Sequence, residues 1–166
     1  MFDRFGNNPT QLSGLLSFAA TTIACLIAIR RSNDARTWGV LALMNCLFLI
    51  EIFSGLRFHI HDLVDTILVA NGWYAQRSWV QTSLDISVVT IVFVFMTHFI
   101  FRRLPAGRGA RAAASITLVI LAQFAMETVS LHALDAIFYQ LIGPVLLIGW
   151  LWAITSAGIC LASFQR

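Results

Sequence analysis

The stretch EIFSGLRFHIHDLVDTILVANGWYAQRSWVQTSLD, residues 51–85, lies between apolar segments that are themselves almost uncharged. It contains six charged side chains, namely Glu51, Arg57, Asp62, Asp65, Arg77 and Asp85. Long apolar runs lie on both sides of it, and about 20 apolar residues in a helix are enough to cross a hydrocarbon layer about 30 Å thick. The stretch therefore predicts a polar connection between two membrane-spanning helices.

The composition of the whole chain indicates a membrane protein. Of its 166 residues, 58% are hydrophobic and 11% are charged, whereas soluble proteins contain about 25% charged residues. We expect an all-α integral membrane protein, a single transmembrane helical bundle over residues 1–166. Its five transmembrane helices are predicted at approximately residues 11–29, 38–57, 78–101, 112–131 and 136–163, with a short amphipathic interfacial helix at approximately 61–70 between the second and the third.

Several function classes are excluded or disfavoured by what the sequence lacks. The basic residues are 11 arginines and no lysine, which excludes a lysine Schiff base or nucleophile and with it a retinal-binding opsin. The three cysteines, Cys25, Cys46 and Cys160, stand singly in apolar segments and are predicted to be buried structural thiols. No nucleophile–base pair and no metal motif is visible, so a membrane-embedded enzyme is the weakest of the hypotheses.

The arginines predict how the chain is oriented. Three of them lie near residue 33, four lie between residues 102 and 111, and Arg166 ends the chain, whereas only Arg57 and Arg77 lie in the central stretch. By the positive-inside rule the first groups are cytoplasmic. We therefore expect a multi-pass protein of the bacterial inner (cytoplasmic) membrane with a periplasmic N-terminus and a cytoplasmic C-terminus. Because orientation accounts for the arginines, no nucleic-acid partner is predicted.

The segment 61–70 is expected to lie along the outer membrane surface. Its apolar residues Leu63, Val64, Ile67 and Leu68 share one helical face, and His61, Asp62 and Asp65 share the other. Ten residues are too few to cross the bilayer. We predict a lid over the bundle, with Trp73, Tyr74 and Trp79 as an aromatic belt at the interface.

Three acidic residues are predicted to reach one depth in the membrane. With a rise of about 1.5 Å per residue, Glu51, Asp85 and Glu127 each come to roughly 8–10 Å below the outer surface. Gln123 lies one turn before Glu127 and extends a polar stripe. Because an ionisable group in a spanning helix is costly, it marks a candidate functional site. The predicted ligand or ion pocket consists of Glu51, Arg57, His61, Tyr74, Arg77, Asp85, Gln123 and Glu127.

Acids outnumber bases on this side of the predicted bundle. Glu51, Asp62, Asp65, Asp85, Glu127 and Asp135 face only Arg57 and Arg77, so some of the acids must be solvated, protonated or bound to a cation. Structural ion pairs are the alternative: Glu51 with Arg57, and Asp85 with Arg77 or Arg57. For Glu127 the alternative is a protonated acid that is hydrogen-bonded across helices.

A metal ion is one candidate occupant of the pocket. His61 and Asp65 are four residues apart, which places them on one helical face, and imidazole with carboxylate suits zinc, copper or iron. The candidate ligands are His61, Asp65, Glu51, Asp85 and Glu127, and the alternative for His61 and Asp65 is a solvated surface. A paired-haem arrangement is not supported, because His98 lies at the opposite side from His59, His61 and His132. A single haem between His61 and His132 is disfavoured but left open.

Two functional hypotheses follow. In the first, the acidic pocket handles a cation, a proton or a small polar ligand. In the second, the chain is a non-catalytic accessory or assembly subunit, surrounded by lipid and by partner membrane subunits or further copies of itself, and the polar residues join helices and subunits. The shared depth of three acids favours the first, and the small size of the chain favours the second.

Overall fold

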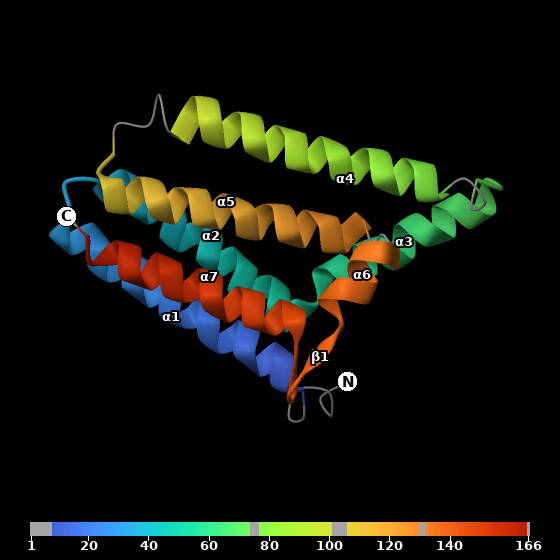
Figure 1. The fold of residues 1–166 in the computed structure, drawn as a ribbon, viewed down its shortest axis with the longest axis horizontal. Helices are drawn as coiled ribbons and strands as arrows, with labels where there is room; N and C mark the ends of the chain where they lie inside the picture. Colours follow the sequence, from blue (N-terminus) through green and yellow to red (C-terminus); the bar gives the residue numbers. More distant parts are fainter. Residues whose placement is uncertain (1–7, 74–76, 101–105, 130–131, 166) are drawn as a thin grey trace.

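The computed structural model describes residues 8–73, 77–100, 106–129 and 132–165. Over these residues the chain is all-α except for one short β-hairpin (Figure 1). The elements in chain order are α1 (Pro9–Arg31), α2 (Ala35–Ser54), α3 (Leu56–Ala70), α4 (Arg77–Val94) with its π-helical continuation η3 (Phe95–Ile100), α5 (Arg108–Val129), α6 (His132–Phe138), β1 (Leu141–Ile142), β2 (Val145–Leu146) and α7 (Leu147–Ser163).

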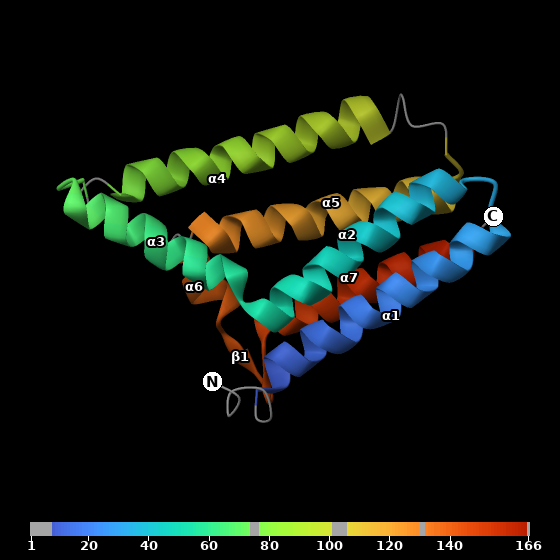
Figure 2. The same ribbon diagram turned by 180° about the vertical axis from the view of Figure 1, so that it is seen from behind.

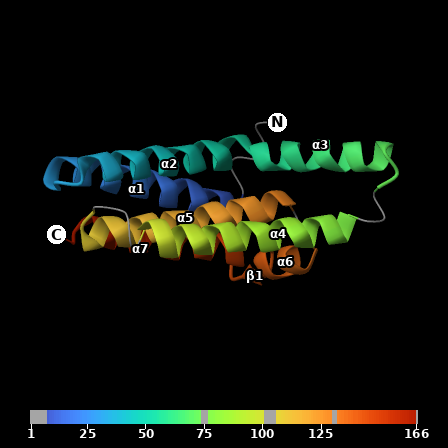
Figure 3. The ribbon, with the colours of Figure 1, turned by 90° about the horizontal axis from the view of Figure 1, so that it is seen from above.

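The helices α1, α2, α5 and α7 form the core of the bundle, and α4 packs along the outside of α5 (Figures 1 and 2). Seen from above, α1, α2 and α3 form one layer, and α4, α5 and α7 form the other (Figure 3). The α1–α2 turn, the start of α5 and the end of α7 lie at one end of the bundle. The helices α3 and α6 and the hairpin lie at the opposite end.

The buried core combines large aromatic residues with small residues that allow close helix approach. Phe18, Phe48, Phe124 and Trp152 fill its middle. Small residues lie nearer the end where α5 begins, among them Ala110, Ala113 and Ala162, and a Cβ atom on Gly109 would collide with the backbone oxygen of Ala162. The close approach of α5 and α7 there explains why that position carries glycine, because small residues at helix interfaces let backbones meet.

Three of the described helices are long and apolar enough to cross a membrane. These are α1, α2 and α5, with 23, 20 and 22 residues. The helices α4 and α7 are also apolar but shorter. Many large apolar side chains point out of the bundle and are exposed. Such a surface is expected where lipid, and not water, is the surrounding solvent. The prediction of an all-α fold is thus confirmed, and three of the described helices are candidate membrane spans.

Local sequence signals explain where the first helices begin and end. The Asn8 side chain accepts hydrogen bonds from the backbone N–H groups of Thr10 and Gln11, at 3.1 and 3.4 Å, and Pro9 takes the first turn of α1. Gly55 ends α2 in the left-handed conformation, with φ 63°. The predicted second helix, 38–57, therefore stops three residues early at its C-terminal end.

The segment after Gly55 forms a longer helix than the sequence predicted. We expected an amphipathic helix over residues 61–70, whereas α3 runs from Leu56 to Ala70 and has 15 residues. Its end agrees with the prediction, since Asn71 and Gly72 terminate it. The helix begins earlier because the left-handed Gly55 turns the chain within a single residue, so no loop is needed between α2 and α3.

The prediction of one helix over residues 136–163 is wrong. The structure has α6, then the hairpin β1–β2 with Leu141 opposite Leu146, and only then α7 from Leu147. Gly143 has φ 65°, which a hairpin turn requires and a helix excludes. Pro144 therefore lies in this turn and does not bend a helix. The hydroxyl of Thr10 accepts a hydrogen bond from the Leu146 N–H at 2.9 Å, which joins the hairpin to α1.

Candidate functional site

The helix α5 carries two buried polar side chains one turn apart near its C-terminal end. Glu127 and Gln123 are each only 5% exposed, on the face of α5 that points into the bundle. Val129 ends the helix two residues later. A carboxyl group removed from solvent in this way either holds a proton or requires a cationic or hydrogen-bonding neighbour.

A ring contact between α2 and α5 fixes the level of Glu51 relative to Glu127. The rings of Phe48 and Phe124 stack, with centroids 5.0 Å apart and planes 12° from parallel. The two helices run in the same direction (Figure 1), because both begin at the end where the Gly107 N–H donates to the Asp34 carboxylate at 2.7 Å. Glu51 lies three residues after Phe48 in α2, and Glu127 lies three residues after Phe124 in α5. They therefore lie at the same level, Glu127 buried and Glu51 half-buried.

A hydrogen bond between α4 and α5 fixes the level of residue 85. The Gln81 side-chain amide donates to the Val129 carbonyl oxygen at 3.0 Å, and the two helices run in opposite directions. Four residues after Gln81 in α4 is residue 85, and four residues before Val129 in α5 is residue 125. Residue 85 therefore lies opposite residue 125, which is between Gln123 and Glu127. The backbone register thus brings positions 51, 85 and 127, from three helices, to one level of the bundle.

Other members of the predicted pocket lie partly or wholly outside what the structure describes. Arg57 and His61 belong to α3, and Arg77 begins α4, but their side chains lie outside the described part. The same is true of the Asp65 and Asp85 side chains, and Tyr74 is outside the described residues altogether. Contact between α3 and α5 brings the α3 backbone close to the helix that carries Glu127. The roles of these residues remain predictions.

Aromatic side chains separate this polar level from the rest of the core. Phe18, Phe48, Phe124 and Trp152 contact one another, and the rings of Phe124 and Trp152 stack with centroids 5.9 Å apart. All four side chains are buried. They fill the middle of the bundle at the level of Gln123, about one turn further inside than Glu51 and Glu127, so they cover the inner side of these two acids.

A second set of buried polar residues, which the sequence analysis did not identify, lies on the other side of these rings. It consists of Thr21, Asn45, Thr117 and Ser156, one residue from each core helix, all buried. Asn45 Oδ1, Thr117 Oγ1 and Ser156 Oγ have no hydrogen-bond partner among the described residues. The signal in the sequence was weak, because single uncharged polar residues in apolar helices are common and usually bond to their own backbone.

The polar level of Glu51, Gln123 and Glu127 contains a buried amide donor besides its carboxyls. Gln123 Nε2 is buried and has no acceptor among the residues that the structure describes. Glu51 and Glu127 both take part in further interactions. An amide donor next to a buried carboxyl can hold a water molecule or a polar ligand between them. The arrangement is thus suited to binding a small polar or cationic species.

Metal and haem binding find no direct support in the described residues. No group of three or more His, Cys, Asp and Glu side chains gathers there in a way that could hold a metal ion. The metal set predicted from the sequence includes the side chains of His61, Asp65 and Asp85, which lie outside the described part of the structure. His98 is exposed on η3, and His132 begins α6. Neither the metal prediction nor the haem alternative is thereby tested.

The chain was compared with known proteins at the level of families, sequences and structures. No family model, no curated protein and no solved structure matches it. The interpretation of the site consequently depends on its own geometry and chemistry.

Proposed function

We propose that the protein is a membrane protein that takes up a cation or a proton at an acidic site on the outer side of its bundle. Glu127 is the central group, Glu51 and Asp85 share its level, and Gln123 contributes a hydrogen bond from below. Arg57, His61, Tyr74 and Arg77 form the rim on the side of α3. A small polar ligand that carries a positive charge would use the same groups.

The burial of Glu127 beside the level of Glu51 is the observation that carries this proposal. Two acids at one depth within an apolar bundle repel each other when both are ionised, so uptake of a positive charge between them is favoured. Gln123 Nε2, buried and without an acceptor among the described residues, supports a bound water or polar species in this layer. The aromatic side chains below it support entry from the α3 end.

The proposed topology has five membrane spans. Besides α1, α2 and α5, the helix α4 with η3 forms a continuous helical segment from Arg77 to Ile100, which is long enough to cross. With 17 residues, α7 is at the lower limit of the length required, and its parallel course beside α1 supports its crossing with that helix. With the arginine-rich turns in the cytoplasm of a bacterium, α3 and the hairpin lie on the periplasmic side.

Ion flux in proteoliposomes tests the proposal. The full chain would be reconstituted, and gradients of protons, sodium or potassium would be imposed separately while internal dyes report each ion. We expect flux of one of these ions, abolished in Glu127→Gln and reduced in Glu51→Gln. Asp62→Asn is the matched control, because Asp62 is an exposed acid on α3, and it should retain the wild-type rate.

The outcome that contradicts the proposal is equally definite. If Glu127→Gln and Glu51→Gln proteins fold normally and behave as wild type does with all three ions, the acids are structural. If instead Asp62→Asn lowers flux as much as Glu127→Gln does, a general surface charge effect replaces the specific site.

The surface of α4 supports a second candidate function, an accessory subunit. This helix meets α5 along one narrow stripe, and its remaining apolar side chains are exposed, including Ile86, Val89, Ile91 and Phe93. A partner helix would cover this face in an assembled complex. The test is purification from native membranes in mild detergent. This function is favoured if a stoichiometric partner co-purifies and is lost when Ile91→Arg is introduced. It is excluded if the protein purifies alone and retains its ion flux.

A further inference from the structure

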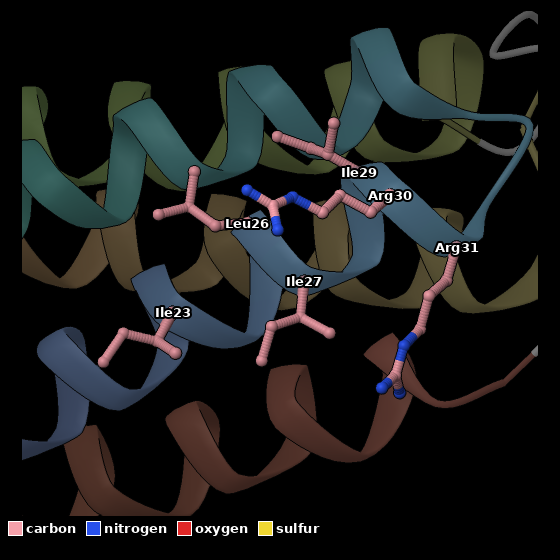
Figure 4. Close-up of a pocket in the computed structure, with 6 residues that line it drawn as sticks. All are labelled: Ile23, Leu26, Ile27, Ile29, Arg30 and Arg31. Carbon is pink, nitrogen blue, oxygen red and sulfur yellow. The ribbon is translucent and has the colours of Figure 1, made fainter.

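A hollow on the outer surface of α1 combines apolar walls with two arginines. It has a volume of about 570 Å³ and lies at the end of α1 that leads into the turn at residues 32–34. The residues that line it are Ile23, Leu26, Ile27, Ile29, Arg30 and Arg31 (Figure 4). Leucine and isoleucine side chains thus form one part of the groove, and guanidinium groups form its end.

The apolar part of this groove faces away from the protein. Ile23, Leu26 and Ile27 are between 42% and 58% exposed, whereas Cys25 and Ala28 on the opposite face of α1 are buried in the core. Because α1 is long and apolar enough to cross a membrane, this exposed face meets the acyl chains of the bilayer.

The two arginines lie where lipid headgroups are found. The 23 residues of α1 span about 34 Å at a rise of about 1.5 Å per residue, slightly more than a hydrocarbon core of about 30 Å. Arg30 and Arg31 are the last two residues of the helix. They therefore lie just beyond the hydrocarbon, at the depth of the phosphates.

Both arginines line the groove, and their guanidinium groups leave α1 in different directions. Figure 4 shows the guanidinium of Arg30 directed back along α1 towards Leu26, and that of Arg31 directed towards α7. Asp34 is the acid nearest in sequence, and its carboxylate accepts the Gly107 N–H at 2.7 Å. A guanidinium above an apolar groove at headgroup depth is complementary to a phosphate that is attached to acyl chains.

We propose that this groove is a binding site for an anionic phospholipid of the leaflet in which α1 ends. Arg30 and Arg31 bind the phosphate of the headgroup, and an acyl chain lies along Ile23, Leu26 and Ile27. The apolar walls select a lipid over a soluble phosphate, and the two positive charges select an anionic over a zwitterionic headgroup. This inference does not depend on the acidic site, which lies near the opposite end of the bundle.

Native mass spectrometry of the full chain in detergent tests the inference. Phosphatidylglycerol and phosphatidylcholine with identical acyl chains would be added in equal amounts. We expect retained phosphatidylglycerol adducts, and a roughly tenfold weaker apparent affinity in the double variant Arg30→Gln, Arg31→Gln, since each arginine near the surface contributes modestly. Arg36→Gln is the matched control, because Arg36 is an exposed arginine at the start of α2, close to the same turn and outside the groove.

A second variant separates the groove from general charge and from misfolding. Ile27→Trp keeps both arginines but fills the groove, and it should also weaken phosphatidylglycerol binding. Equal binding of the two lipids to the wild-type protein would overturn the inference. So would an equal loss in Arg36→Gln, an unchanged affinity in Ile27→Trp, or complete displacement of the lipid by inorganic phosphate, which would indicate a site for a soluble anion.

Discussion

Phe48 of α2 stacks on Phe124 of α5 with ring centroids 5.0 Å apart, and one turn further along these parallel helices Glu51 and Glu127 occupy one level. The same two rings belong to the aromatic group that closes the core below the acids. This contact therefore aligns the two helices, and the aromatic group lies between the two acids and the buried polar residues on its other side.

Removal of the Phe124 ring should destabilise the bundle strongly. Phe124 contacts Phe18, Phe48 and Trp152 and is 6% exposed, so Phe124→Ala leaves a cavity where three contacts were made. We expect a loss of about 3 kcal/mol or more in unfolding free energy, measured by denaturant titration in detergent. The control Phe93→Ala, at an exposed site on α4, should lose much less. Equal losses would contradict the packing described.

Two glycines should respond in opposite directions to the same substitution. A Cβ at Gly109 would collide with the Ala162 backbone oxygen, whereas nothing lies within 4 Å of a Cβ at Gly39. Gly109→Ala should therefore lower the thermal stability by separating α5 from α7. Gly39→Ala should raise the unfolding free energy by up to about 1 kcal/mol, since alanine favours a helix. A stabilised Gly109→Ala protein would show that α5 and α7 are not in close contact.

Part of this structure could be predicted from the sequence, for reasons that particular residues make clear. The long apolar runs of α1, α2 and α5 matched the predicted helices within a few residues. The common level of Glu51 and Glu127 within the bundle was predictable because both helices start from the same end and rise regularly. The hairpin was not predictable from apolarity alone, since Leu141–Leu147 is as apolar as the helix beyond it. The local signal is the dipeptide Gly143-Pro144, because glycine allows the positive φ of this turn and proline interrupts a helix.

The polar features that the sequence analysis missed share one physical property. Thr21, Asn45, Thr117 and Ser156 are uncharged, so nothing in the sequence separates their buried positions from lipid-facing ones. Their burial follows only from packing between helices. The register of α4, set by the Gln81–Val129 hydrogen bond, is likewise a tertiary property that spacing along one helix does not encode.

The register between α4 and α5 can be tested by cross-linking. In a background with Cys25, Cys46 and Cys160 replaced by alanine, cysteines at positions 81 and 129 should be joined rapidly by a short bifunctional thiol reagent. The control pair, 92 and 129, should not react, because position 92 lies about 16 Å further along α4. Preferential cross-linking of the control pair would show a different register between α4 and α5, in which residue 85 does not lie at the level of Glu127.

The orientation of the bundle can be tested with single cysteines in the same background. Asn33 and Asn71 lie in exposed turns at opposite ends, after α1 and after α3. In intact cells whose outer membrane has been made permeable, an impermeant maleimide should label Asn71→Cys at once. Asn33→Cys should be labelled only after the inner membrane is opened. The reverse pattern would place the acidic level on the cytoplasmic side.

The most direct test of the central claim is the reactivity of Glu127 towards a lipophilic carbodiimide, followed by peptide mass spectrometry. Such reagents modify carboxyl groups that are protonated in apolar surroundings. We predict modification at Glu127, faster than at the exposed Asp62, and slowed when pH is raised or when the transported cation is added. If Glu127 is unmodified, or is modified at a rate that neither pH nor any cation changes, the acidic level does not exchange protons or cations and the account is contradicted.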